Sequence, residues 1–240
     1  MKKIALVTGG SGALGSAIAQ RLAADGLHIV VHSNKNLASA SETVEKIAQA
    51  GGSAQAEQFD ITDPQACTTA LERLLEQGPI QVLVNNAGIH DDAVMPGMSL
   101  SQWNSVIDVS LNGFFHVTQP LLMPMIRTRW GRIINVSSVS AVTGNRGQAN
   151  YAAAKAGLHG ASKSLSLEVA SRGITVNVIT PGIIESAMAE QAFDADRISQ
   201  MVPMKRAGKP EEVAALVGFL ASDQASYISG QIIGVNGALA

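Results

Sequence analysis

Tyr151 and Lys155 stand four residues apart and could carry out acid–base chemistry if the segment around them is a helix. Residues at this spacing project from the same face of a helix, so the ammonium would lie beside the phenol. The pKa of a free tyrosine is about 10, and a neighbouring positive charge lowers it toward the neutral range. The spacing alone also fits an ordinary pair on a helix surface, so its interpretation depends on the surroundings.

Ser138 follows an apolar run, residues 132–137, that is typical of a buried strand. Ligands of open parallel sheets bind at the carboxyl ends of the strands, where this serine would lie. Its hydroxyl could form a hydrogen bond with a carbonyl oxygen while Tyr151 gives that oxygen a proton. The three residues together indicate acid–base chemistry at a carbonyl group.

The stretch TGGSGALG, residues 8–15, lies between an expected strand and an expected helix. Glycines let the backbone approach a phosphate closely, and free N–H groups at a helix start attract anions. Gly10, Gly12 and Gly15 match the spacing G-x-G-x-x-G. A Walker loop is excluded because no lysine follows Gly15, and a nucleophile elbow is excluded because Ala13 follows Gly12. We therefore expect a dinucleotide-binding turn, the alternative being a tight turn without a ligand.

Short apolar runs alternate with longer helical stretches along the whole chain. Most of the runs are continuously apolar, as expected when helices cover both faces of a parallel sheet. The predicted fold is therefore α/β, a Rossmann-type doubly wound parallel sheet of about seven strands with helices on both faces, in a single domain over residues 1–240. The expected strands are residues 4–7, 28–31, 54–59, 82–85, 132–137, 175–180 and 231–235.

Helix boundaries are marked at several places. Asp63 can cap a helix whose first residue is Pro64, and Gly173 is a natural left-handed stop for the helix that carries Tyr151. Another helix is expected to begin at Pro210, because acidic residues follow it.

The bulk composition excludes several classes of protein. The chain has 240 residues, of which 46% are hydrophobic, and a net charge of -2, so neither disorder nor a strong attraction to nucleic acid is expected. One cysteine, Cys67, rules out an intrachain disulfide framework, and the five histidines show no metal-ligand spacing. No apolar stretch is long enough for a signal peptide or a membrane span. We expect a cytoplasmic protein that binds no metal.

The segment His32-Ser33-Asn34-Lys35 bears on the choice of dinucleotide. An acidic residue that grips the ribose 2′-hydroxyl of NAD is expected there, about 20 residues after the glycines, and none is present. This favours NADP(H) over NAD(H), although Gly12 stands where an arginine could have held the 2′-phosphate. The alternative is that Lys35 is a solvated loop residue.

Beyond these features, the chain resembles the short-chain dehydrogenases/reductases, and among them the 3-oxoacyl-[acyl-carrier-protein] reductases most closely. The resemblance covers essentially the whole chain through the segments GQANYAAAKAGL, SRGITVNVITPGIIESAM, GKPEEVA and ASYISGQ. It implies that Ser138, Tyr151 and Lys155 are the catalytic serine, tyrosine and lysine of that family.

The resemblance also implies a set of cofactor contacts. They comprise the glycine-rich turn, the end of the second strand, the pair beside the adenine (Asp60 and Ile61), the NNAG element (residues 85–88), the catalytic pair and the loop along the nicotinamide carboxamide. In chain order these residues are Gly9, Ser11, Gly12, Leu14, Gly15, His32, Ser33, Asn34, Asp60, Ile61, Asn86, Ala87, Gly88, Tyr151, Lys155, Pro181, Gly182, Ile184 and Ser186.

Two positions depart from the family pattern T-G-x-x-x-G-x-G and its usual proton relay. Ala13 takes the place of the second glycine, which is tolerable only where the backbone has a negative φ and some room. Ser110 stands where the family commonly has an asparagine that helps a water molecule relay protons to the lysine. Asn112, two residues further on, would point about 200° away on a helix. Ser110 could hold the water itself or bond to a carbonyl one turn earlier.

The activity that the resemblance implies is reduction of a 3-oxoacyl thioester to a 3-hydroxyacyl thioester by NADPH, with acyl carrier protein as partner and a homotetramer as the assembly. Arg129 and Arg172 match residues that relatives use to meet an acidic carrier, and in isolation each would be an ordinary solvated arginine. The rather apolar loop 184–203 fits an acyl chain. A reductase of a sugar, polyol or other small alcohol is the enzymatic alternative, and a dinucleotide sensor would require a broken Ser–Tyr–Lys set.

Overall fold

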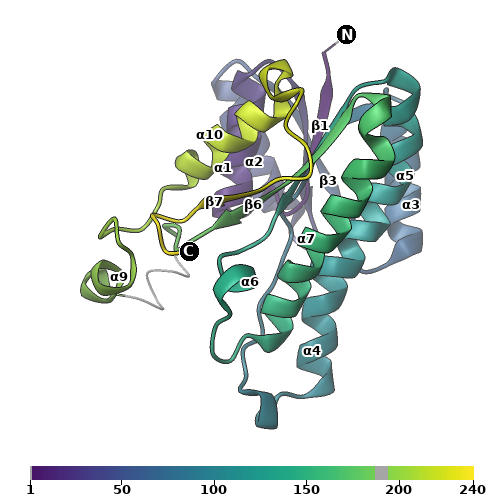
Figure 1. Ribbon diagram of the computed structural model, residues 1–240. Coiled ribbons are helices and arrows are strands. Elements are labelled where there is room, and N and C mark those ends of the chain that lie inside the picture. Colours follow the sequence, from purple (N-terminus) through teal and green to yellow (C-terminus); the bar gives the residue numbers. More distant parts are fainter. Residues whose placement is uncertain (1, 187–193) are drawn as a thin grey trace.

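The computed structural model describes residues 2–186 and 194–240. Seven parallel strands form one sheet in the order β3-β2-β1-β4-β5-β6-β7 (Figure 1), which confirms the predicted fold class. The strands are β1 Ile4–Val7, β2 His28–Ser33, β3 Ser53–Gln58, β4 Ile80–Asn85, β5 Gly131–Val136, β6 Ile174–Pro181 and β7 Ile232–Val235.

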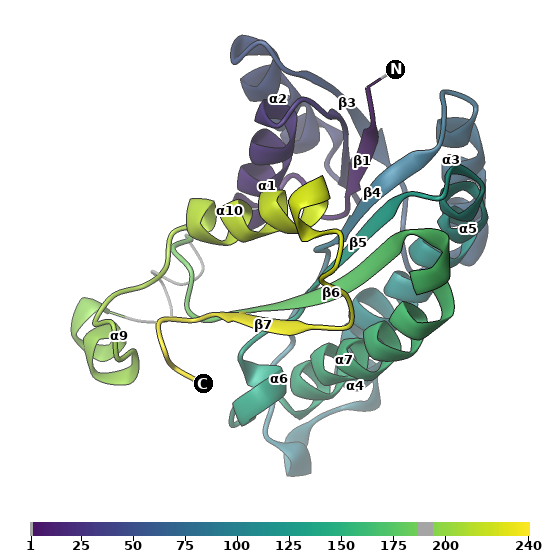
Figure 2. The ribbon, with the colours of Figure 1, turned by 45° about the horizontal axis from the view of Figure 1, so that its top comes forward.

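Helices cover both faces of the sheet (Figure 2). One face carries α1 Ala13–Ala24, α2 Leu37–Gln49 and α10 Pro210–Ala221, and the other carries α3 Pro64–Leu75, α4 Leu100–Ile107, α5 Gly113–Thr128 and α7 Ala149–Val169. Shorter elements are α6 Ser140–Thr143, α9 Ala195–Met201, the 3₁₀ turns η1 Met95–Gly97, η3 Ala170–Arg172 and η4 Asp223–Ala225, and the π-helical turn η2 Asp108–Asn112.

Two separate cores explain why most of the strands are continuously apolar, whereas the edge strand β3, SAQAEQ, is mostly polar and only partly buried. Successive strand residues point to opposite faces, so Ala5 and Val7 of β1 enter the core under α1 and α10, whereas Leu6 enters the core under α3 and α5. All three side chains are fully buried. A strand covered on both faces cannot alternate apolar with polar residues, as the sequence predicted.

The predicted helix boundaries are confirmed at their caps. The Asp63 carboxylate accepts hydrogen bonds from the backbone N–H groups of Gln65 and Ala66 at 2.9 and 3.1 Å. Gly173 ends the helical stretch after α7 with φ +75°, and a Cβ there would lie 2.3 Å from the Arg129 carbonyl oxygen. Only glycine fits such a position.

The strand β2 is two residues longer than predicted. It runs to Ser33 because His32 and Ser33, although polar, are buried and pair with β3. The strand order reverses beside β1, whose neighbours are β2 and β4. In sheets of this kind a crevice opens at that point beyond the carboxyl ends of the strands, and the loops described next surround it.

Candidate active site

The structure brings Ser138, Tyr151 and Lys155 together at the carboxyl edge of the sheet. Ser138 follows β5 closely, and the other two residues lie on successive turns at the start of α7. The side chains of Ser138 and Tyr151 share a hydrogen bond, and the ammonium of Lys155 lies 5.8 Å from the centre of the Tyr151 ring. A Ser–Tyr pair beside a buried ammonium can present a proton and a hydrogen bond to one substrate oxygen.

The pKa of Tyr151 differs from the value expected from the sequence. Burial raises this pKa above its ordinary value, the hydrogen bond with Ser138 lowers it, and the negative charge of Asp92 raises it further. The expectation of a lowered pKa was therefore wrong for the protein alone, because desolvation of the tyrosinate outweighs the other effects.

Lys155 is buried, and its position is fixed by the sheet. The ammonium donates a hydrogen bond of 2.9 Å to the Val136 carbonyl oxygen, its one hydrogen bond to the part of the chain that the structure describes. Burial lowers the pKa of Lys155 to about 8. An ammonium can donate three hydrogen bonds, so this group retains donors for a ligand.

Ser110 lies in the same neighbourhood, next to Gly88. A Cβ placed on Gly88 would be 2.9 Å from the Lys155 Nζ and 3.5 Å from the Ser110 Oγ. The hydroxyl of Ser110 is buried and has no hydrogen-bond partner within residues 2–186 and 194–240. It therefore does not bond back to a carbonyl of the preceding turn, which removes one of the two expected roles.

The π-helical turn η2 explains how Ser110 is aimed inward. Turns of this kind insert one extra residue into a helix and are frequent at functional sites. Asn112, in the same turn, is exposed and donates to the Asp108 carboxylate at 2.7 Å. The expectation that Asn112 does not substitute for the family's asparagine is confirmed.

The glycine-rich turn between β1 and α1 closes tightly on itself. Gly9 has φ +62°, and a Cβ on Gly15 would lie 2.1 Å from the Gly9 carbonyl oxygen, so a side chain at Gly15 is impossible. Gly12 caps α1, and a Cβ placed there would have no neighbouring atom closer than 3.6 Å. Ala13 is the first helical residue, where φ is negative, and this is why it replaces a glycine without strain.

The NNAG element supports this turn from the β4 side. The Asn86 side chain donates hydrogen bonds of 3.0 and 3.1 Å to the carbonyl oxygens of Thr8 and Gly9. The Thr8 hydroxyl accepts from the backbone N–H groups of Asn86 and Ala87. The glycine-rich turn and the NNAG element therefore form one rigid unit across the point where the strand order reverses.

A cavity of about 580 Å³ lies at the ends of β2 and β3. Its lining includes Ser11, Ser33, Asn34, Lys35 and Asp60, all of which except Lys35 were expected to contact the cofactor. The Ser33 hydroxyl is buried and has no partner among the residues that the structure describes. An unpartnered buried hydroxyl beside a glycine cradle fits the ribose end of a dinucleotide, because burial without a partner is costly unless a ligand supplies one.

His32 differs from the expectation that it contacts the cofactor. Its side chain is 1% exposed and does not line the cavity. One ring nitrogen, Nδ1, accepts a hydrogen bond from the Gly9 backbone N–H at 3.1 Å, and Nε2 lies 2.9 Å from the Phe59 carbonyl oxygen. The alternation of side chains along β2 therefore directs the His32 ring into the protein interior, where it contacts the glycine-rich turn from the side away from the cavity.

The remaining expected contacts lie around the same crevice. Gly182 follows β6 and donates its backbone N–H to the Val235 carbonyl oxygen, and Ile184 pairs with Gly208 in an isolated bridge.

Ile61 is buried, and its carbonyl oxygen lies 2.9 Å from the His116 Nδ1. Leu14 packs against the α1 core, Pro181 ends β6, and Ser186 is the last residue described before the gap. Within the expected substrate loop, residues 187–193 lie outside the described residues.

Arg129 and Arg172 lie close to each other but far from Tyr151. The Arg129 side chain donates to the Ser171 carbonyl oxygen at 3.2 Å, next to Arg172. Both follow the C-terminal ends of helices, whereas Tyr151 lies at the start of α7. A helix of 21 residues is about 30 Å long, so the arginines lie far from Tyr151, which is at the other end of α7.

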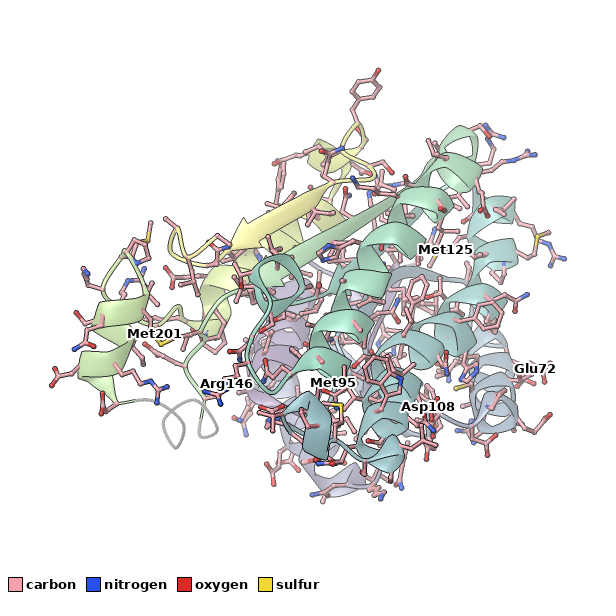
Figure 3. The ribbon with its side chains drawn as sticks, turned by 60° about the horizontal axis from the view of Figure 1, so that its bottom comes forward. Glu72, Met95, Asp108, Met125, Arg146 and Met201 are labelled. Atoms are coloured by element: carbon pink, nitrogen blue, oxygen red, sulfur yellow. The ribbon has the colours of Figure 1, made fainter. Side chains whose placement is uncertain are left out.

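Sequence reasoning missed Asp92 and the loop that holds it. The Asp92 carboxylate accepts a hydrogen bond of 2.8 Å from Gln148, just before α7, and its charge acts on Tyr151. The backbone N–H of Ala93 donates to the Gly147 carbonyl oxygen, so the turn η1, which begins at Met95, and the loop with Arg146 are neighbours beside the start of α7 (Figure 3). No spacing in the sequence links residue 92 with residue 148, because the contact exists only in the folded chain.

The described part of the chain contains neither a membrane-spanning helix nor a cluster of metal ligands. Within it no helix is long and apolar enough to cross a membrane. Residues 2–186 and 194–240 also contain no group of three or more His, Cys, Asp or Glu side chains placed to hold a metal ion.

The parallel sheet, the glycine cradle and the Ser–Tyr–Lys cluster define a dinucleotide-dependent oxidoreductase, and the comparisons agree. A family model described as Enoyl-(Acyl carrier protein) reductase matches residues 10–239. The chain is 44% identical over 245 residues to the 3-oxoacyl-[acyl-carrier-protein] reductase of Escherichia coli K12, covering 99% of this chain and 97% of that protein.

Two other relatives show how far the similarity extends. The 3-oxoacyl-[acyl-carrier-protein] reductase of Aggregatibacter actinomycetemcomitans is 41% identical over 241 residues, covering all of both chains. The acetoacetyl-CoA reductase of Allochromatium vinosum is 42% identical over 249 residues, covering 100% of this chain and 99% of that protein. The chain belongs to the short-chain dehydrogenase/reductase family.

Proposed function

We propose that this protein reduces a 3-oxoacyl thioester, carried on acyl carrier protein, to a 3-hydroxyacyl thioester with NADPH. The observation that carries the proposal is the hydrogen-bonded Ser138–Tyr151 pair beside the buried Lys155, at the edge of the sheet next to the glycine-rich turn. Relatives named 3-oxoacyl-[acyl-carrier-protein] reductase, at 41 to 44% identity, support the substrate class.

Tyr151, Ser138 and Lys155 have different roles at the substrate carbonyl. A dinucleotide held beside the glycine-rich turn would supply the hydride that is added to the ketone carbon. Tyr151 donates its proton to the ketone oxygen, so that a hydroxyl group forms, and Ser138 donates a hydrogen bond to the same oxygen. Lys155 lies beside Tyr151, where its charge stabilises the tyrosinate left after the proton transfer and its free donors can hold a ribose hydroxyl.

Ser110 supports the return of a proton to Tyr151. Its unpartnered hydroxyl and the Lys155 Nζ both border Gly88, and a water molecule held between them would connect the ammonium with solvent. This is the remaining one of the two roles expected from the sequence.

The preference for NADPH rests on the end of β2. The cavity at the ribose end is lined by Lys35 and by the unpartnered hydroxyl of Ser33, and the segment from His32 to Lys35 contains no carboxylate that would repel a 2′-phosphate. A phosphate group beside Ser33 and Lys35 would receive a hydrogen bond and a positive charge, although the carboxylates of Asp60 and Asp108 also line this cavity.

The location of Arg129 and Arg172 bears on the acyl carrier and on assembly. A carrier bound at these arginines could not feed the Tyr151 of the same protomer, because the length of α7 separates them. The carrier role therefore requires a second copy of the chain whose active site lies beside these arginines. The proposed carrier role and the proposed homo-oligomer, with the tetramer as the expected state, therefore depend on each other.

A CoA thioester is the second candidate substrate, because one relative of similar identity is named acetoacetyl-CoA reductase. The reaction at the ketone is the same, and the two candidates differ in the group that carries the thioester. Only the carrier-bound substrate would depend on Arg129 and Arg172.

The test measures oxidation of NADPH and of NADH with a 3-oxoacyl carrier conjugate, with its CoA counterpart and with a panel of small ketones. We expect the carrier conjugate with NADPH to give the highest kcat/KM, and activity that is equal or higher on the small ketones would overturn the proposal. Tyr151→Phe should abolish turnover and leave NADPH binding, measured by fluorescence titration, largely intact. Retained turnover in that variant would contradict the assigned role of Tyr151.

A further inference from the structure

His32 has every polar atom of its ring engaged by the backbone of two different segments. The Gly9 N–H donates to Nδ1, so Nδ1 carries no proton, and Nε2–H must donate to the Phe59 carbonyl oxygen. The ring is thereby held in one neutral tautomer. It also packs against the Phe59 ring, with the two centroids 4.2 Å apart.

The two segments that His32 joins are the two walls of the dinucleotide crevice. Gly9 belongs to the glycine-rich turn, and Phe59 directly precedes Asp60 and Ile61, at the end of β3. The backbone of His32 adds a third connection, since its carbonyl oxygen accepts from the Gly10 N–H at 2.9 Å.

Gly9, which follows β1, is held by residues from both strands that flank β1. Its N–H is bound by His32 from β2, and its carbonyl oxygen is bound by Asn86 from the β4 side. The peptide at Gly9 has a positive φ, which makes its orientation dependent on these partners. If His32 were lost, a buried N–H would be left unpaired, and the turn would have to move to satisfy it.

We propose that His32 is a positioning residue for the dinucleotide, which it does not touch, and that its fixed tautomer sets the spacing between the glycine-rich turn and the adenine-side wall. This inference rests on the proposed function. A binding site whose walls are already spaced for the ligand avoids the cost of ordering them on binding, so His32 acts on cofactor affinity.

Two substitutions separate the two hydrogen bonds. His32→Asn places an acceptor near the position of Nδ1 but does not reach Phe59, and His32→Gln places a donor near Nε2 but leaves the Gly9 N–H without its acceptor. His28→Gln is the matched control, since His28 begins the same strand and also bonds to β3, through Ser53 and Gln55, away from the turn.

The readout is the dissociation constant of NADPH, measured by fluorescence titration without an acyl substrate. We expect His32→Gln to weaken binding by roughly tenfold, His32→Asn by less, and His28→Gln by less than about twofold. In steady-state assays the KM for NADPH should rise with His32→Gln, while kcat and the KM for the acyl substrate stay close to those of the parent protein. Unchanged NADPH affinity in His32→Gln, or an equal loss in His28→Gln, would overturn the inference.

A measurement on the unsubstituted protein keeps the inference testable if the variants fail to fold. The Gly9 amide should exchange its hydrogen as slowly as the amides of the central strands, with no cofactor present, and the ¹⁵N spectrum should show His32 protonated at Nε2 alone. Rapid exchange at Gly9 or the other tautomer would also overturn it. If the unsubstituted protein binds neither NADPH nor NADH, the proposed function fails, whereas equal binding by parent and His32→Gln defeats only the role of His32.

Discussion

His32 and Lys155 are both buried ionisable side chains, and burial lowers the pKa of each, to about 4 and about 8 respectively. They differ in how fully the chain satisfies them. Both ring nitrogens of His32 are paired with backbone groups, whereas the ammonium of Lys155 has one hydrogen bond among the described residues and lies near the unpartnered hydroxyl of Ser110.

This difference separates a residue that shapes the site from residues that act in it. A fully paired buried group contributes to structure, because every partner is part of the fold. A buried group with unused donors costs free energy in the folded protein, and the cost is offset when a substrate or cofactor provides the missing partner. Burial alone would have placed His32 and Lys155 in the same category.

Lys155→Met gives the largest expected effect and tests the buried group whose hydrogen-bond donors are not all used. The variant should lose at least about a hundredfold in kcat, because the charge that stabilises the tyrosinate of Tyr151 is gone. Its free energy of unfolding at pH 7 should stay equal or rise, because an ammonium with a lowered pKa is charged there at a cost to the folded state. Steady-state kinetics and urea denaturation measure the two quantities.

Lys163→Met, which replaces an exposed lysine on the same helix, is the control and should change neither quantity appreciably. A large loss of stability in Lys155→Met, with turnover retained, would reverse the distinction drawn between Lys155 and His32.

The next largest expected effect is the loss of stability when acid protonates His32. Its pKa is about 6.5 in the unfolded chain and about 4 in the folded protein, so between these values the unfolded state binds more protons. The stability that neutral His32 contributes is fully present above pH 6.5 and is lost as the pH falls from 6.5 toward 4, by about 3 kcal/mol in all.

The measurement is urea denaturation across that pH range for the parent protein and for His32→Gln, whose glutamine does not titrate. The difference in unfolding free energy between the two should shrink steadily as the pH falls, and other titrating groups cancel in this difference. A constant difference from about pH 7 to about pH 4 would mean that His32 is not held neutral.

Ser110→Ala gives the smallest of the expected effects, and its effect on stability is opposite in sign to that of acid on His32. Removing a buried hydroxyl without a partner should raise the free energy of unfolding by about 1 kcal/mol, whereas Ser162→Ala should lower it, because Asn135 would lose its acceptor. The same Ser110→Ala variant should turn over more slowly if the hydroxyl takes part in the proton relay. Lower stability in Ser110→Ala would show that the hydroxyl has a structural partner after all.

The sequence was sufficient for the sheet, the caps and the Ser138–Tyr151–Lys155 cluster, because continuous apolar runs and helical spacing are local properties. The inward orientation of His32 was missed because the strand was expected to end at Val31, one residue too early to assign its face. The direction of the Tyr151 pKa shift was also missed, since the balance between burial and a neighbouring charge depends on packing that no spacing encodes.

The π-helical turn η2 can also be described as an angular offset between two stretches of one long helical rod. The chain spends one residue more on this turn than an α-helix would, and one residue corresponds to about 100° of rotation. The side chains of α4, before the turn, are therefore rotated about the helix axis relative to those of α5, after it. Deleting one residue from the turn would regularise the helix and turn Ser110 away from Lys155, an effect that no substitution at position 110 can reproduce.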